Sequence, residues 1–399
     1  MITRTAVKSN TYRDSVSLMS VSNKVNEIDG VQQAFVAMGT EMNKGVLASL
    51  DLLSDELGAA STGDLMIVVV AEDDSVIDAA FERVDDLLQR KAPQGGGGQH
   101  RRTYHTIASA AADIPGANLA VIAVGGAFAA REARQALENG LHVIMFSDNV
   151  PVEDEVALKA LAHDKGLLMM GPDCGTAIIN GNGLCFANAV RRGNIGIVGA
   201  SGTGSQELSV RIHDFGGGVS QLIGTGGRDL SEAVGGVMML DGFQALVDDP
   251  ATDVIALISK PPHPSVEQKV LDAVANSPKP VVVCFLGGSE AAVVKAGATF
   301  AKTTKLAALE AVKLTGVKEE DLDLHALNWP LIEEVRAKLT PEQRYIRALF
   351  CGGTLCDESM FAAMEKYDDV YSNIAPNPEH RIGAREASVA HTFLDFGDD

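Results

Sequence analysis

The feature that most constrains the fold of this chain is the segment Ile195–Glu207, which reads IGIVGASGTGSQE. A short apolar run, typical of a buried strand, leads through Gly199 and Gly202 into a helical pattern. The glycines permit a sharp bend and the close approach of a ligand, while Ser201 and Thr203 place hydroxyl groups where the helix begins. Unpaired N–H groups and the positive end of the helix dipole lie at the same point. The segment predicts a βα turn that binds an anion; an ordinary N-capped turn is the alternative.

A glycine run marks the first domain boundary. Residues 92–102, APQGGGGQHRR, contain four consecutive glycines and no apolar residue after the first, which is typical of a flexible linker. Before it, residues 1–91 alternate strand-like and helix-like runs, including the apolar run at Leu65–Ala71. They predict a small α/β or α+β domain.

Regular alternation of short apolar runs and amphipathic segments continues after the linker. The runs are apolar throughout and rich in β-branched residues, as buried parallel strands are. Two doubly wound α/β domains are therefore predicted, at 103–190 and 191–325. A further strand and helix in 340–399 predict a third α/β unit, which is shorter than a usual domain and is interpreted as partial.

Two more glycine turns resemble the first. The segment FCGGTLCDE repeats the design of strand, paired glycines and hydroxyl, with Gly353 and Thr354 at the helix start. Two such helix starts can hold one phosphoryl or acyl phosphate group from both sides. The turn GTGGRD contains Gly226, Gly227 and Arg228, and the fork-shaped guanidinium suits a carboxylate or phosphate. A solvated loop is the alternative reading of this third turn.

Charge and cysteine content exclude several classes of function. The 53 acidic and 33 basic residues give a net charge of -20, which is the wrong sign for nucleic acid or an anionic membrane surface. No apolar run approaches the roughly 18 residues of a membrane helix. Five cysteines without a C-x-x-C pair indicate a reduced, cytoplasmic setting, and the scattered histidines predict no metal site. The expected ligand is a small anion.

From Tyr104 to about Leu314 the chain resembles the α-subunit of succinyl-CoA synthetase and related acyl-CoA ligases. The matching motifs are VGGAF, QALENGLHVI, SDNVP, MMGPDCG, IGIVGASGTGSQE and GTGG. The segment LFCGGTLCDE is similar to the element of the β-subunit that opens the second phosphate-facing helix. With an extra N-terminal domain and both helices in one chain, the sequence resembles the FdrA family of acyl-CoA synthetase-like proteins. The resemblance implies a Rossmann-like CoA-binding-type domain at 103–190, a flavodoxin-like ligase-type domain at 191–325 and a partial second ligase-type domain at 340–399.

The chain also departs from those ligases. A histidine in a G-H-A-G-A context carries the phosphoryl group in the ligases, whereas the similar stretch here is VKAGA, with Lys295. The acidic residue that supports the histidine is replaced by Lys260. We find no counterpart of the glycine-rich unit that holds CoA or of the ATP-grasp half. CoA therefore stays an open cofactor, and an acyl phosphate such as carbamoyl phosphate is the expected substrate.

FdrA-like proteins are associated with allantoin and oxamate catabolism, in which a carbamoyl group passes between oxalurate and phosphate. The resemblance thus implies a carbamoyltransferase subunit that works with other subunits from neighbouring genes or as a homodimer. Two alternatives stay open, an acyl-CoA synthetase subunit that needs a separate nucleotide-binding partner, and a non-catalytic regulatory protein. The expected roles are phosphate binding by Ser201, Gly202, Thr203, Gly204, Gly353 and Thr354, substrate binding by Gly226, Gly227 and Arg228, and catalysis by Arg228, Lys260 and Lys295.

Overall fold

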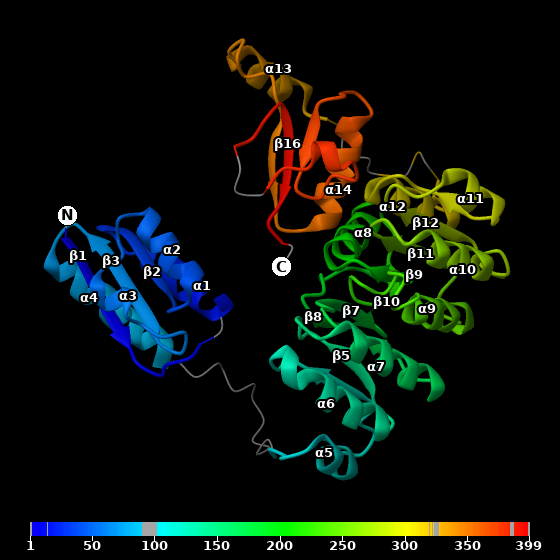
Figure 1. The fold of residues 1–399 in the computed structure, drawn as a ribbon, viewed down its shortest axis with the longest axis horizontal. Helices are drawn as coiled ribbons and strands as arrows, with labels where there is room; N and C mark the ends of the chain where they lie inside the picture. Colours follow the sequence, from blue (N-terminus) through cyan, green and yellow to red (C-terminus); the bar gives the residue numbers. More distant parts are fainter. Residues whose placement is uncertain are drawn as a thin grey trace. The chain divides into compact units, whose positions relative to one another are not determined.

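The computed structural model describes residues 2–13, 15–89, 102–318, 320, 322, 327–383 and 387–397. The chain divides into two compact units, Met1–Arg102 and Thr103–Asp399 (Figure 1). The predicted linker at 92–102 lies outside the described residues except for its last residue.

The first unit is a three-stranded antiparallel sheet in the order β1-β3-β2. Its central strand β3 alternates between two cores, because successive side chains of a strand point to opposite faces. Ile67 and Val69 pack with α1 and α4, whereas Met66 and Val68 pack with α2 and α3. The antiparallel pairing makes this unit an α+β domain. The elements are β1 Ile2–Lys8, α1 Ser15–Asn26, β2 Val31–Met38, α2 Glu41–Ser49, α3 Asp55–Gly58, β3 Leu65–Ala71 and α4 Asp74–Gln89.

The second unit begins with a small parallel sheet in the order β4-β5-β6. Alanines 129, 133 and 136 along α6 are fully buried, so the helix approaches the sheet closely. The elements are α5 Ile107–Asp113, β4 Leu119–Ile122, α6 Gly126–Glu138, β5 His142–Met145, α7 Val152–Asp164 and β6 Met169–Met170.

A seven-stranded sheet follows, in the order β13-β12-β11-β9-β10-β7-β8. Its five strands from β9 to β13 are parallel, and helices cover both faces, α8 and α12 on one and α9 and α10 on the other. The doubly wound α/β prediction is confirmed. The elements are β7 Thr176–Ile179, β8 Asn182–Cys185, β9 Arg192–Ala200, α8 Gly202–Asp214, β10 Val219–Gly224, α9 Val237–Asp248, β11 Val254–Ser259, α10 Pro264–Val274, β12 Val281–Phe285, α11 Glu290–Lys295, β13 Thr299–Phe300 and α12 Thr304–Leu314.

The hairpin of β7 and β8 was not predicted. It belongs to the sequence range 103–190, yet β7 pairs antiparallel with β10 of the seven-stranded sheet, through Ile178 and Leu222. The boundaries at 190 and between 325 and 340 stay predictions.

The last part of the second unit is a parallel sheet in the order β14-β16-β15, so the final strand of the chain lies in the centre. Helix α14 packs on it through Cys356, Met360 and Ala363. Helix α13 was not predicted, and none of its residues is buried. Among the described residues, we find no helix with the length and apolarity that crossing a membrane requires. The elements are α13 Trp329–Lys338, β14 Arg347–Phe350, α14 Gly353–Met364, β15 Val370–Ser372, the 3-10 helix η2 Pro378–His380 and β16 His391–Asp395.

Candidate functional site

Strand β9 lies between β10 and β11, so the chain crosses over in opposite directions on its two sides. In open α/β sheets, ligands bind at the carboxyl end of the strands at such a switch point. Helix α8 begins there. Ser201 is its N-cap, and the Oγ atom accepts a hydrogen bond from the N–H of Gly204 at 3.0 Å. The N–H groups of the first two helical residues, Gly202 and Thr203, make no hydrogen bond within the described chain.

Helix α14 begins against the start of α8 (Figure 1). Its N-cap is Gly352, which provides no side-chain hydrogen bond, so the N–H groups of Gly353 and Thr354 stay unpaired within the part of the chain that is described. The fully buried hydroxyl of Thr354 hydrogen-bonds the hydroxyl of Ser201. The two predicted phosphate-binding turns therefore meet directly.

Glycine is required at this contact. A Cβ atom on Gly352 would lie 2.8 Å from Cγ2 of Thr203, and one on Gly204 would lie 2.9 Å from Cγ2 of Thr354. Both distances are shorter than van der Waals contact allows. We call the set Ser201, Gly202, Thr203, Gly204, Gly352, Gly353 and Thr354 the helix junction.

Two charged side chains lie beside Gly353. A Cβ atom at this position would come within 2.5 Å of Cε of Lys260 and 2.9 Å of Oδ2 of Asp395. Lys260 is half-buried directly after β11, and Asp395 is buried at the end of β16. The Oδ2 atom of Asp395 has no hydrogen-bond partner within the described chain, whereas Oδ1 accepts from the N–H of Gly397 at 3.0 Å. The helix junction thus brings two positive helix ends together, and the ammonium of Lys260 and the carboxylate of Asp395 lie beside it.

Cys356 lies one turn into α14 and is fully buried. Burial raises the pKa of this thiol to about 12, and the carboxylates of Asp395 and Asp357 act in the same direction. A thiolate is the nucleophilic form of cysteine. Cys356 is therefore a packing residue of α14 rather than a nucleophile.

Helix α14 also contacts the layer around the seven-stranded sheet at a second point, the start of α12. The carboxylate of Glu358 accepts a hydrogen bond from the N–H of Thr304 at 2.8 Å. Desolvation raises the pKa of Glu358 above its ordinary value. Further along, the ammonium of Lys302 lies 2.9 Å from Glu365. These contacts fix the direction in which the start of α14 points.

The third glycine turn lies close to the junction. A cavity of about 10 Å³, the size of one water molecule, separates Gly226 from Ser201 and Gly202. Gly226 has a φ of +89°, which favours glycine, and a Cβ atom at this position would lie only 2.4 Å from the carbonyl oxygen of Pro172. The other lining residues are Asp173, Cys174, Gly175, Thr176, Gly199 and Gly224.

Arg228 is engaged in a structural contact. Its Nε donates to Oε2 of the buried Glu155 at 3.0 Å, and Nη2 donates to the carbonyl of Val150 at 2.8 Å. Its Nη1 makes no hydrogen bond among the described residues. Gly227 lies next to it, with open space where a Cβ would be.

A buried ion network lies behind this turn. The ammonium of Lys159 donates to Glu155 Oε1 at 2.7 Å, to Asp229 Oδ1 at 2.8 Å and to the carbonyl of Thr225 at 2.9 Å. Asp229 also accepts from the N–H of Met239 at 2.8 Å. Helix α7 is thereby joined to the GTGG turn through charges that solvent does not reach.

Among the predicted site residues, Lys295 takes no part in the contacts described above. It is exposed in the last turn of α11 and makes no hydrogen bond or ion pair within the described ranges. Three charged residues around the site were not predicted, Asp395, Glu155 and Lys159. The position of Asp395 directly after an apolar strand was an available signal. The chemical roles assigned to all these residues stay predictions.

Two domain families match the chain. The family described as AllF, heavy metal-associated domain, matches residues 1–104. The CoA binding domain family matches residues 190–287, which contain the turn at Ser201. Soft metals prefer thiolate ligands, and residues 1–104 contain no cysteine. Within the described residues, no group of three or more histidine, cysteine or acidic side chains is placed to hold a metal.

Individual proteins that are similar to the chain extend these matches. The uncharacterized protein YahF of Escherichia coli (strain K12) is 64% identical over 399 residues, which are 100% of this chain and 77% of that protein. The α-subunit of the ADP-forming succinate–CoA ligase of Methanothermobacter thermautotrophicus is 26% identical over 233 residues, 56% of this chain and 75% of the relative.

Among solved structures, the apo dinucleotide-forming acetyl-coenzyme A synthetase 1 of Ca. Korarchaeum cryptofilum is similar with a TM-score of 0.44 and 19% identity. The similarity covers 67% of this chain and 58% of that one, so the chain spans less than two thirds of the solved protein.

Proposed function

Because the chain belongs to the FdrA-like family that includes YahF, we propose that it is an acyl-CoA ligase-like subunit that transfers an acyl group from or to phosphate at the helix junction. The group we propose is carbamoyl, passed between oxalurate or oxamate and phosphate as in allantoin catabolism. The small-molecule substrate is then carbamoyl phosphate, and CoA is not needed for this transfer.

One observation supports this proposal above the others, the direct meeting of the starts of α8 and α14 through Ser201 and Thr354. Each helix start carries about half a positive charge, and four N–H groups of the junction are unpaired among the described residues. The ammonium of Lys260 lies beside Gly353. In the proposed complex, the two hydroxyls turn from each other to oxygens of the phosphoryl group.

We assign different roles in the transfer to the two charged groups, Lys260 and Asp395. The amide nitrogen of oxamate attacks the carbonyl carbon of carbamoyl phosphate, the bond from that carbon to the phosphate oxygen breaks, and phosphate leaves. Lys260 and the helix ends stabilise the charge that develops on the leaving phosphate. Asp395, whose Oδ2 is unpartnered among the described residues, accepts the proton that the attacking nitrogen loses.

The substrate carboxylate is assigned to the GTGG turn. Gly226 borders the same small cavity as Ser201, and Gly227 leaves its backbone open. Arg228 contributes through Nη1, because its other two nitrogens hold Glu155 and Val150. Lys295 is expected to act as a more distant cation, since it is exposed and lies outside the junction contacts.

We propose a cytoplasmic location and an assembly with further subunits or a second copy of the chain. The five cysteines are unpaired thiols, which fits a reducing compartment. The succinate–CoA ligase relative is itself named as a subunit.

Phosphate release from carbamoyl phosphate in the presence of oxamate tests the proposal. The chain is co-expressed with the products of its neighbouring genes and assayed as Lys260→Met, Thr203→Val and Lys295→Met variants. We expect Lys260→Met to lower turnover by about a hundredfold, the usual effect of losing one group that stabilises transition-state charge. Lys295→Met is the matched control and should change turnover by much less. Unchanged turnover in both Lys260→Met and Thr203→Val contradicts the proposed site.

The succinate–CoA ligase relative and the CoA binding domain match also favour a second candidate, an acid–thiol ligase subunit with a separate nucleotide-binding partner. That candidate predicts ADP formation that depends on both CoA and a carboxylic acid. If ADP forms in this way and oxamate causes no phosphate release, the activity at the helix junction is acid–thiol ligation rather than carbamoyl transfer. Absence of both activities and of phosphate binding would favour the regulatory alternative.

A further inference from the structure

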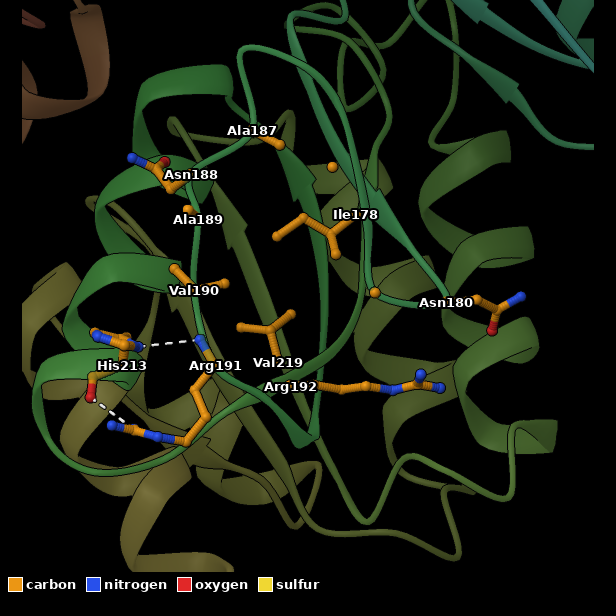
Figure 2. Close-up of a pocket in the computed structure, with 12 residues that line it drawn as sticks. Ile178, Asn180, Ala187, Asn188, Ala189, Val190, Arg191, Arg192, His213 and Val219 are labelled. Atoms are coloured by element: carbon orange, nitrogen blue, oxygen red, sulfur yellow. Dashed lines mark hydrogen bonds between the residues drawn. The ribbon is translucent and has the colours of Figure 1, made fainter. Parts of the chain in front are cut away.

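A large pocket lies at the opposite end of α8 from the helix junction. Its volume is about 760 Å³, within the usual range of small-molecule sites. Residues of the β7–β8 hairpin, of the segment that leads into β9, of β10 and of the last turn of α8 line it (Figure 2). It lies at the amino end of β9 and β10, so it is separate from the site proposed above.

The middle of the pocket is apolar. Ile178, Val190 and Val219 lie between Asn188 and Arg192 in the view of Figure 2. Apolar side chains on three different segments offer a surface on which a ring or short hydrocarbon body gains contact area and leaves water. A simple inorganic anion would leave this surface uncovered.

The charged groups of the pocket are cationic. Arg191 donates from Nη1 to the carbonyls of His213 at 3.0 Å and Gly217 at 2.7 Å, so it is fixed at the end of α8. Arg192 packs its Cδ atom over Gly181, while its guanidinium makes no hydrogen bond or ion pair within the described ranges. Figure 2 shows the side chains of Arg191 and Arg192 pointing to opposite sides, so in a protein with a net charge of -20 the guanidinium of Arg192 alone forms a local site for an anion.

Two further polar atoms define what the rest of a ligand offers. The Oδ1 atom of Asn188 is buried and has no hydrogen-bond partner in the described part of the chain. Such an atom costs free energy unless a donor reaches it. The Nδ1 atom of His213 accepts from the N–H of Arg191 at 3.0 Å, which places the ring proton on Nε2 and makes that atom a donor.

We propose that this pocket binds an organic monoanion that has an apolar ring or chain and an N–H or O–H donor. The anionic group pairs with Arg192, the apolar body lies on Ile178, Val190 and Val219, and the donor reaches Oδ1 of Asn188. The inference does not depend on the proposed function, because it uses none of the residues of the helix junction.

Titration calorimetry of the full chain tests the proposal with four probes. Indole-3-acetate and indole-3-butyrate carry the ring, the N–H group and the carboxylate at two lengths. Indole lacks the anion, and naphthalene-1-acetate lacks the N–H group. We expect at least one indole acid to bind with a Kd about tenfold or more below that of indole, because a hydrogen-bonded ion pair is the stronger type of contact.

Variants assign the two ends of the ligand. Arg192→Met should remove the advantage of the indole acid over indole, and Arg192→Lys should restore part of it. Asn188→Leu should remove the advantage over naphthalene-1-acetate. Arg336→Met is the matched control, since Arg336 is an exposed arginine on α13. The proposal is overturned if neither indole acid binds, or if Arg192→Met and Arg336→Met have the same effect on their affinity.

Discussion

The ammonium of Lys159 lies 2.8 Å from the carboxylate of Asp229, and neither side chain is exposed to solvent. Lys159 also forms an ion pair with Glu155, and Glu155 forms a second ion pair with Arg228. Two carboxylates and two cations thus neutralise each other where α7 meets the GTGG turn. The turn that lies nearest the helix junction is positioned by this network.

Lys159→Met should destabilise the second unit strongly. The substitution keeps most of the volume but leaves two buried carboxylates with one partly exposed cation. Breaking a buried pair by removing one partner costs about 3–5 kcal/mol. Denaturant unfolding measures the change. Lys295→Met, an exposed position, should stay within about 0.5 kcal/mol of the parent protein, and an equally small effect at Lys159 would show that the network does not stabilise the fold.

Thr354→Val should weaken phosphate binding as well as stability. The side chain keeps its shape but loses the hydroxyl that bonds Ser201. We expect a loss of about 1–3 kcal/mol in the free energy of unfolding and a Kd for inorganic phosphate about tenfold higher in calorimetry.

Thr252→Val is the control for this variant. Thr252 is another buried threonine and lies outside the junction. Its hydroxyl bonds that of Ser220 at 2.7 Å and also donates to Oδ2 of Asp249 at 2.8 Å. It should lose at least as much stability as Thr354→Val, because two hydrogen bonds of its hydroxyl are removed, and it should leave the phosphate Kd unchanged. Equal phosphate affinity of the two variants would argue against the role of Thr354.

Glu358 should make the stability of the second unit depend on pH. Desolvation raises its pKa above the ordinary value of 4.5, so the folded state favours the protonated carboxyl. The stability that this group contributes is fully present below about pH 4.5 and is lost as the pH rises through the raised pKa.

Glu358→Gln removes this titration and keeps an oxygen that accepts from the N–H of Thr304. The unfolding free energy of the parent minus that of the variant should therefore fall from pH 4.5 upward. Glu365→Gln is the comparison, because Glu365 is the exposed C-cap of α14 and loses only an exposed ion pair with Lys302. A difference that rises over this pH range contradicts the assignment.

Gly353→Ala should impair substrate binding with little effect on folding. The added methyl group meets the end of Lys260, a flexible side chain that can move away, and the carboxylate of Asp395. Displacing the ammonium removes one charge from the proposed phosphate site, so the KM for carbamoyl phosphate should rise about tenfold or more in the transfer assay.

Gly45→Ala provides the comparison for Gly353→Ala. Gly45 lies inside α2, and an added methyl group would have no atom within 4 Å, so the change should stabilise the first unit by about 0.5–1 kcal/mol. Its KM should equal that of the parent protein. An unchanged KM in Gly353→Ala would place Lys260 outside the phosphate site.

Local sequence signals predicted the turns well. At Ser201 the glycines and hydroxyls lie within a few residues of each other, and the N-cap that they predict is present. The same design at Gly353 predicted the start of α14. Helix α13 was missed although its start has a recognisable pattern, Asn328 with Pro330 two residues later, and the Oδ1 of Asn328 accepts from the N–H of Leu331.

Contacts between distant segments were harder to predict. Glu155 lies in the first turn of α7, where acidic residues are common because they stabilise the helix. The sequence around it therefore does not indicate that it pairs with Arg228. Asp395 meets the junction only because β16 is the central strand of its sheet. The order of strands arises from tertiary packing, which the pattern along one strand does not encode.

Ser201 and Thr354 are 153 positions apart in one polypeptide. Their encounter is therefore intramolecular, and its effective concentration is set by the connecting chain rather than by the amount of protein. Two subunits that carried these helices separately would part on dilution. In this chain the two halves of the proposed phosphate site stay together however dilute the protein becomes.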